Sequence, residues 1–270
     1  MELFGYQNYN FGRRISSNHN FRYSLKFFNR EVAYEPDSLD AFSEFPPQSG
    51  GEGSLSFTYI FSNKRPELNI MLMPRNGYGL KIATNFTDKN IWGDFTYNHY
   101  ELDSYINKKI GPFTLYSRAR YEQISGSPPN QETAGLVDIP TNYYVGQLIL
   151  GKEHMSPRGY SGSKLGNSVF MGTTEFRSPL INLNIIEFLR IIKAGKLSLS
   201  IISDYGKVWG SENEDWVVTA GIESRISLLI GNFPLLVYSA GIAQTTSDWS
   251  KNPDAKNVDP YFRLALVNPF

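Results

Sequence analysis

The most informative segment of this chain is HMSPRGYSGSKLGNSVFMGTTEFRSPL, residues His154–Leu180. It joins a Pro-Arg-Gly-Tyr loop around Arg158 to a run of alternating residues that contains one carboxylate, Glu175. A second carboxylate, Asp204, follows in the segment SLSIISDYG. An arginine in a glycine-bearing loop can form strong charge-assisted hydrogen bonds to carboxylates on nearby strands. The pattern therefore predicts a loop that is tied down inside a hollow structure.

The composition excludes several classes of protein. The chain has 270 residues, with 26 Lys and Arg against 26 Asp and Glu, so no net field attracts nucleic acid. It has no cysteine, which excludes disulfides and thiolate metal sites. No run approaches the roughly 18 apolar residues of a membrane helix. A membrane β-barrel stays open, because its alternating strands average out as mildly polar, like this chain with its mean hydropathy of −0.33.

Period-two alternation of apolar and polar residues runs along most of the chain. Leu115, Ala119 and Tyr121 alternate with Arg118, Arg120 and Glu122. Successive side chains of a strand point to opposite faces, so each such segment has one apolar and one polar face. We predict eleven strands, at residues 3–13, 20–34, 53–63, 68–87, 91–106, 111–125, 167–179, 196–206, 216–229, 235–246 and 259–270.

A water-soluble β-sandwich and a membrane barrel both fit alternation. The segments are long, about 10 to 14 residues, and their polar faces repeatedly carry Arg, Lys and Glu, which favours tilted membrane strands. The predicted fold is therefore all-β, an antiparallel transmembrane β-barrel. The links 35–52, 126–166, 207–215 and 247–258 are predicted to be long external loops, and the turn at Thr87–Asn90 to be short. The link 180–195 is predicted to form an interfacial amphipathic helix.

Three motifs resemble the BamA-like superfamily of outer-membrane barrels, also called bacterial surface antigens. HMSPRGY resembles the Arg-Gly-aromatic motif of the family's inward-folded external loop, here residues 126–166. GTTEFRSPL and SDYGKVW resemble the two strands that follow that loop, and the final residue Phe270 resembles the family's C-terminal assembly signal. Family barrels have sixteen strands. The resemblance therefore implies that residues 1–270 are the C-terminal part of an incomplete or open barrel.

The resemblance also implies a lock that holds this loop. Parity places Glu175 and Asp204 on the faces opposite Phe176 and Ile201, so both carboxylates are predicted to point into the lumen. Arg158 would lie between them, Gly159 would permit the tight turn, and Tyr160 would pack against the barrel wall. The alternative is an exposed loop arginine with two ordinary solvated lumen carboxylates.

The function implied by the resemblance is insertion or translocation of other polypeptides at the bacterial outer membrane, without hydrolysis. The expected partners are outer-membrane lipids, client or secreted polypeptides and periplasmic subunits of an assembly complex. We expect no cofactor, no metal and no catalytic residue. Three alternatives remain: a passive channel or porin, the barrel anchor of a periplasmic β-propeller or lipase domain, and an outer-membrane lipid hydrolase that uses His154 and Ser156.

Overall fold

The structure of the chain is a computed structural model. It describes residues 2–9, 18–30, 48–63, 76–130, 132–137, 155–179, 181–183, 187–188, 192–230, 233–246 and 259–266. Within these ranges, no helix has the length and apolar character needed to cross a membrane.

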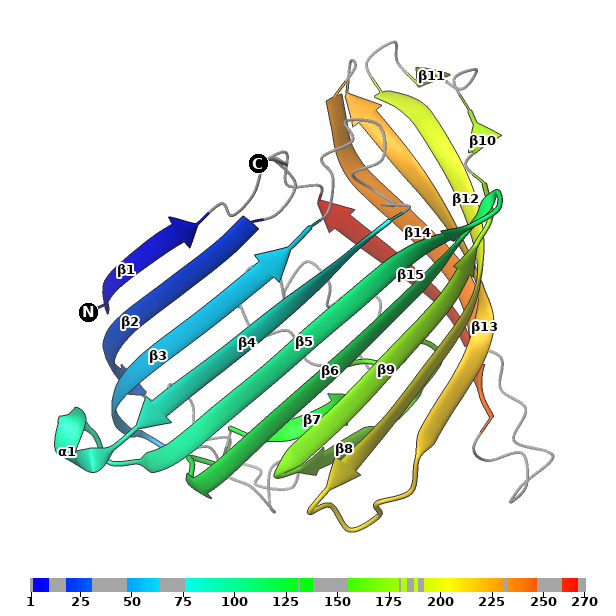
Figure 1. Ribbon diagram of the computed structural model, residues 1–270. Helices are drawn as coiled ribbons and strands as arrows, with labels where there is room; N and C mark the ends of the chain where they lie inside the picture. Colours follow the sequence, from blue (N-terminus) through cyan, green and yellow to red (C-terminus); the bar gives the residue numbers. More distant parts are fainter. Residues whose placement is uncertain are drawn as a thin grey trace.

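One antiparallel sheet dominates the molecule (Figure 1). Its strands pair in chain order, except that β7, β8, β10 and β11 lie off this path. The strands of the path are β1 (Glu2–Tyr9), β2 (Asn18–Arg30), β3 (Gly50–Ser62), β4 (Gly77–Thr87), β5 (Thr96–Ile110), β6 (Phe113–Ser127), β9 (Ser168–Arg177), β12 (Ile192–Trp209), β13 (Val217–Ile230), β14 (Phe233–Thr245) and β15 (Asp259–Leu266).

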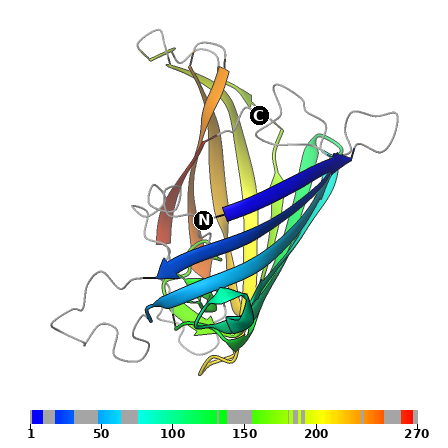
Figure 2. The ribbon, with the colours of Figure 1, turned by 90° about the vertical axis from the view of Figure 1, so that its left-hand side faces the viewer.

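The sheet curves into an open wall. Figure 2 shows β1–β3 and β12–β15 on opposite sides of it. β1 and β15 are the two ends of the strand path, and no pairing in the described part of the chain joins them. Each strand of the path overlaps one of the eleven predicted strands. The predicted all-β fold, with its open sheet, is confirmed.

The two faces of the wall differ sharply in chemistry. On β12, the side chains of Ser198, Ser200 and Asp204 are buried on the concave inner face, whereas Leu199 and Ile201 point outward. Ile201 is 65% exposed, the highest value among the large apolar side chains in the described part of the chain. On the inner face of β4–β6, Lys81 pairs with Glu101 and Arg118 pairs with Asp103. The wall is therefore polar inside and apolar outside, as expected for a membrane barrel.

Aromatic side chains gather on the outer face near both ends of the strands. We call the end with the links 88–95, 128–167 and 210–216 the loop end, and the opposite end the turn end. Ring contacts near the loop end join Phe86 to Tyr100, Tyr121 to Trp209 and Phe170 to Trp216. Near the turn end, Phe61 contacts Tyr78 and Phe113 stacks on Phe176. Two such belts flank the apolar band of outer-membrane barrels.

The link between β6 and β9 is not wholly irregular. It contains a small two-stranded antiparallel sheet, formed by β7 (Ala134–Val137) and β8 (Ser163–Gly166), which lies behind the main sheet in Figure 1. The fully buried Leu136 of β7 packs with Met155 of the same link and with Val169 and Val208 of the wall. This apolar cluster fills the inside of the wall at its loop end and anchors the link there.

Two predictions about links are wrong. The link 180–195 is no helix in its described part: β10 (Ile181–Asn182) and β11 (Glu187–Phe188) pair with β12, which itself begins at Ile192. An isolated helix of this length is marginal in water, whereas β12 offers an extended partner to which β10 and β11 pair. The predicted short turn after Thr87 instead holds α1 (Lys89–Trp92), with Asp88 as its N-cap, and β5 therefore starts only at Thr96.

Candidate functional site

Arg158 lies at the centre of a buried charge cluster on the inner face of the wall. It sits in the link between β6 and β9, and its side chain is 2% exposed. Its Nε and Nη2 donate to the two oxygens of Asp204 on β12 at 2.8 and 2.7 Å, and its backbone N–H donates to Asp204 Oδ2 at 2.9 Å. Its Nη1 donates to Glu175 Oε1 on β9 at 2.8 Å. A two-point fork of this kind fixes orientation as well as distance.

Three further side chains complete the cluster. Glu223 on β13 accepts from Arg158 Nη1 at 3.3 Å and is also bonded by Arg225 Nε. Arg225 Nη2 donates to Glu175 Oε1 at 2.7 Å, and Arg177 Nε donates to Glu175 Oε2 at 2.8 Å. The cluster therefore joins one loop residue to three adjacent strands.

The charges of the cluster balance, because three guanidinium groups face three carboxylates. Burial by itself would lower the pKa of Arg158, but the charge of Asp204 and its hydrogen bond, with the charges of Glu175 and Glu223, raise it well above the ordinary value. These interactions favour the charged form of Arg158. A buried ion is tolerated only when it is paired and hydrogen-bonded, and Arg158 meets both conditions.

Gly159 lets the loop approach the wall closely. Its φ of +71° lies in the left-handed region, and a Cβ at this position would come within 2.6 Å of the backbone carbonyl carbon and oxygen of Ala243 on β14. Thr245 Oγ1 donates to Gly159 O at 3.0 Å. Only glycine fits this conformation in this space.

Gly159→Ala is expected to lower the free energy of unfolding by about 1–2 kcal/mol through backbone strain, and by about 1–3 kcal/mol more through overlap with Ala243. The matched control is Gly111→Ala, because Gly111 has a φ of +58° but no atom within 4 Å of the added Cβ. Denaturant unfolding in detergent micelles measures both variants. Equal losses for the two variants would show that the loop does not press on β14.

Tyr160 packs at the edge of the apolar cluster beside the wall. Its backbone N–H donates to Pro157 O at 3.4 Å, which closes a turn over Arg158 and Gly159. Met155, three residues before Arg158, is buried, with an exposed fraction of 1%. The backbone N–H of Val137 donates to Met155 O at 3.0 Å. The turn is thus held from both sides, by apolar packing before it and by the wall after it.

A second ion cluster ties the start of the same link to the opposite part of the wall. Arg30 Nη2 on β2 donates to Glu132 Oε1 at 2.8 Å, and Arg30 Nε donates to Glu52 Oε2 on β3 at 2.9 Å. Tyr97 OH on β5 donates to Glu52 Oε1 at 2.8 Å. The link is therefore attached to the wall by charged groups at two places.

The structure brings Arg158, Gly159, Glu175 and Asp204 together. Sequence reasoning missed Arg177, Arg225 and Glu223 as members of the cluster. A signal for them existed, because Arg177 follows Glu175 by two residues and Arg225 follows Glu223 by two, so each pair shares a strand face. No comparable signal indicated the contact of Arg30 with Glu132, which depends on the path of a long link.

Two other predicted residues, Phe270 and His154, lie outside the described residues. Within the described ranges, no three His, Asp or Glu side chains are grouped so that they could hold a metal ion.

One family model matches most of the chain. The model of the Omp85 superfamily domain matches residues 7–243, which include every member of the Arg158 cluster. The chain belongs to the Omp85 superfamily. Members of the Omp85 superfamily are bacterial outer-membrane β-barrels involved in polypeptide assembly and translocation, so the predicted BamA-like resemblance is confirmed. No curated protein matches the chain.

Proposed function

We propose that this Omp85-superfamily chain forms part of a bacterial outer-membrane barrel that inserts or translocates polypeptides, without hydrolysing them. The observation that carries the proposal is the buried Arg158 cluster, which fixes the link between β6 and β9 against the inner wall. A loop held there narrows the lumen, which favours a gated path over an open pore. The proposed partners of the chain are outer-membrane lipids, client polypeptides and periplasmic subunits of an assembly complex.

The loop acts in this proposal as a lock, made of Arg158, Gly159 and Tyr160 with Glu175 and Asp204. Arg177 and Arg225 support the lock because each pairs with Glu175, a carboxylate that Arg158 also contacts. Glu223 supports it by pairing with both Arg158 and Arg225. Fold alone does not fix the activity of a barrel, so the lock is what separates this proposal from a passive channel.

Reconstitution tests the proposal. The chain is placed in liposomes of outer-membrane phospholipid, a urea-unfolded β-barrel client is added, and protease-protected client is measured over time. Wild type is expected to insert the client several-fold faster than Arg158→Ala or empty liposomes. Parallel bilayer recordings are expected to show low conductance for wild type. A steady open conductance with no acceleration of insertion would instead support a passive channel.

A further inference from the structure

We propose that a groove on the outer face of the wall binds an acyl chain of a membrane phospholipid. The groove has a volume of about 620 Å³ and crosses β9, β12, β13 and β14 near the turn end, with Phe113 of β6 at its edge. Such a volume is in the range of sites that hold small ligands. The inference depends on the membrane placement in the proposed function, and it adds a ligand site which that function does not require.

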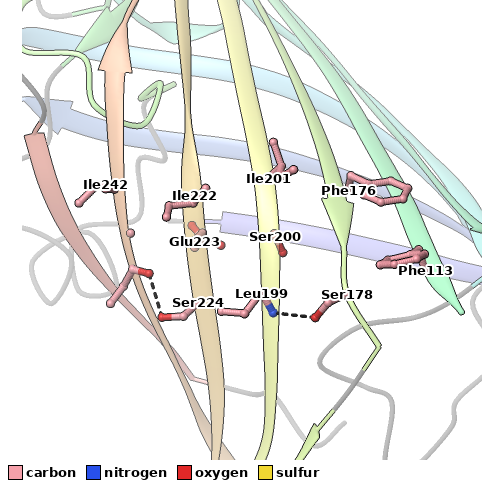
Figure 3. A pocket seen from close by; sticks show the side chains of 12 residues that line it. Phe113, Phe176, Ser178, Leu199, Ser200, Ile201, Ile222, Glu223, Ser224 and Ile242 are labelled. Carbon is pink, nitrogen blue, oxygen red and sulfur yellow. Dashed lines mark hydrogen bonds between the residues drawn. The ribbon is translucent and has the colours of Figure 1, made fainter. Parts of the chain in front are cut away.

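The groove arises from a row of large side chains beside a second row whose members are small except for Leu199. Phe176, Ile201, Ile222 and Ile242 are direct cross-strand neighbours and form the large row. The next outward positions on β13 and β14 are Ser224 and Ala240, which also pair directly. Figure 3 shows Ser224, Leu199 and Ser178 side by side below the isoleucines. The small side chains leave a depression that the isoleucines and the Phe113–Phe176 stack border.

The outward-facing hydroxyl groups of the groove are paired within the protein. Ser224 Oγ donates to Ala240 O at 3.1 Å, and Ser178 Oγ accepts from Leu199 N at 2.9 Å. Glu223 and Ser200 also belong to the lining, but they are a cross-strand pair whose side chains point to the inner face, where Glu223 bonds Arg158 and Arg225 and Ser200 Oγ is buried without a partner among the described residues. A ligand on the outer face therefore meets paired hydroxyls and apolar side chains, which favours a hydrocarbon chain over a polar molecule.

The surroundings identify the source of that chain. The groove lies on the apolar outer face, beside the aromatic belt at the turn end, and is continuous with the surface that faces lipid. Its isoleucines include Ile201, Ile222 and Ile242, which are 65%, 57% and 45% exposed. The ligand that surrounds this face in a membrane is phospholipid.

Photo-crosslinking tests the site. Wild type is placed in vesicles that contain a phospholipid with a diazirine on its acyl chain, and labelled peptides are mapped by mass spectrometry. We expect labelling to be several-fold higher around Leu199–Ile201 and Ile222–Ser224 than around Ile82, Leu102 and Ile106. Those three side chains are 42%, 41% and 49% exposed on the outer face of β4 and β5, close to the 45% of Ile242, but lie outside the groove.

A substitution that fills the groove provides the second arm. Ala240→Phe should reduce labelling of the groove to the level seen on the outer face of β4 and β5. It should also remove a bound phospholipid that we expect native mass spectrometry to detect on wild type. Ala119→Phe, on the outer face of β6 outside the groove, should change neither. Uniform labelling of the whole wall, or a cross-link to a second protein chain at the groove, overturns the site. If neither the groove nor the outer face of β4 and β5 is labelled, the membrane placement itself is overturned.

Discussion

Arg158→Ala is expected to lower the free energy of unfolding of the folded chain in detergent by about 3–5 kcal/mol, because it removes one partner from a buried ion cluster. Asp204, Glu175 and Glu223 would then lie close together with fewer cations between them. Arg158→Lys should restore only part of the loss, since an ammonium group cannot reproduce the two-point fork to Asp204. Denaturant unfolding, monitored by the heat-dependent migration of the protein in gels, measures the loss for both variants.

The matched control for this change is Arg22→Ala. Arg22 lies on β2, is exposed, and bonds Asn20 at 3.1 Å. Its removal should cost less than about 1 kcal/mol, as expected for an exposed polar contact. A loss for Arg158→Ala no greater than that for Arg22→Ala would mean that the buried cluster does not hold the loop.

Glu175→Gln is expected to cost about 3 kcal/mol or more. Glu175 accepts hydrogen bonds from Arg158, Arg177 and Arg225, so its neutralisation leaves three buried cations with two carboxylates. The glutamine keeps the shape of the side chain, so a loss reports the missing charge rather than a cavity. The same unfolding measurement applies.

Glu101→Gln serves as the control for Glu175→Gln. Glu101 also pairs with a cation on the inner face, but its partner Lys81 is 39% exposed and the pair is open to water. The expected loss is about 0–1 kcal/mol. Equal losses at Glu101 and Glu175 would place the stability of the wall in its general charge pattern and not in the Arg158 cluster.

The strands and their faces could be predicted from the sequence because alternation is a local property. Leu199 and Ile201 against Ser200 and Asp204 already indicate which face of β12 is apolar. The two-stranded sheet of β7 and β8 could not be predicted in this way, because a strand of four residues shows too little alternation to be recognised. Those strands depend on the packing of Leu136 against the inner wall.

The same difference between local and long-range features applies to the site. Parity placed Glu175 and Asp204 on the inner face, and the motif resemblance added Arg158. The arrangement around them depends on neighbouring strands that are distant in the chain, such as Glu223 on β13, 65 residues from Arg158. The link's contact with Arg30 spans 102 residues and follows no periodic rule. Long-range register and loop paths are therefore what the sequence alone left open.

The most direct test of the lock is the solvent accessibility of Met155. The chain has no cysteine, so Met155→Cys gives a single thiol at a position that is 1% exposed. With Arg158 in place, a water-soluble maleimide should label this thiol slowly. In the Arg158→Ala background, labelling should be at least about tenfold faster, because the loop then leaves the wall. The exposed Ser161→Cys should label rapidly in both backgrounds. Equal rates for Met155→Cys with and without Arg158 would contradict the lock.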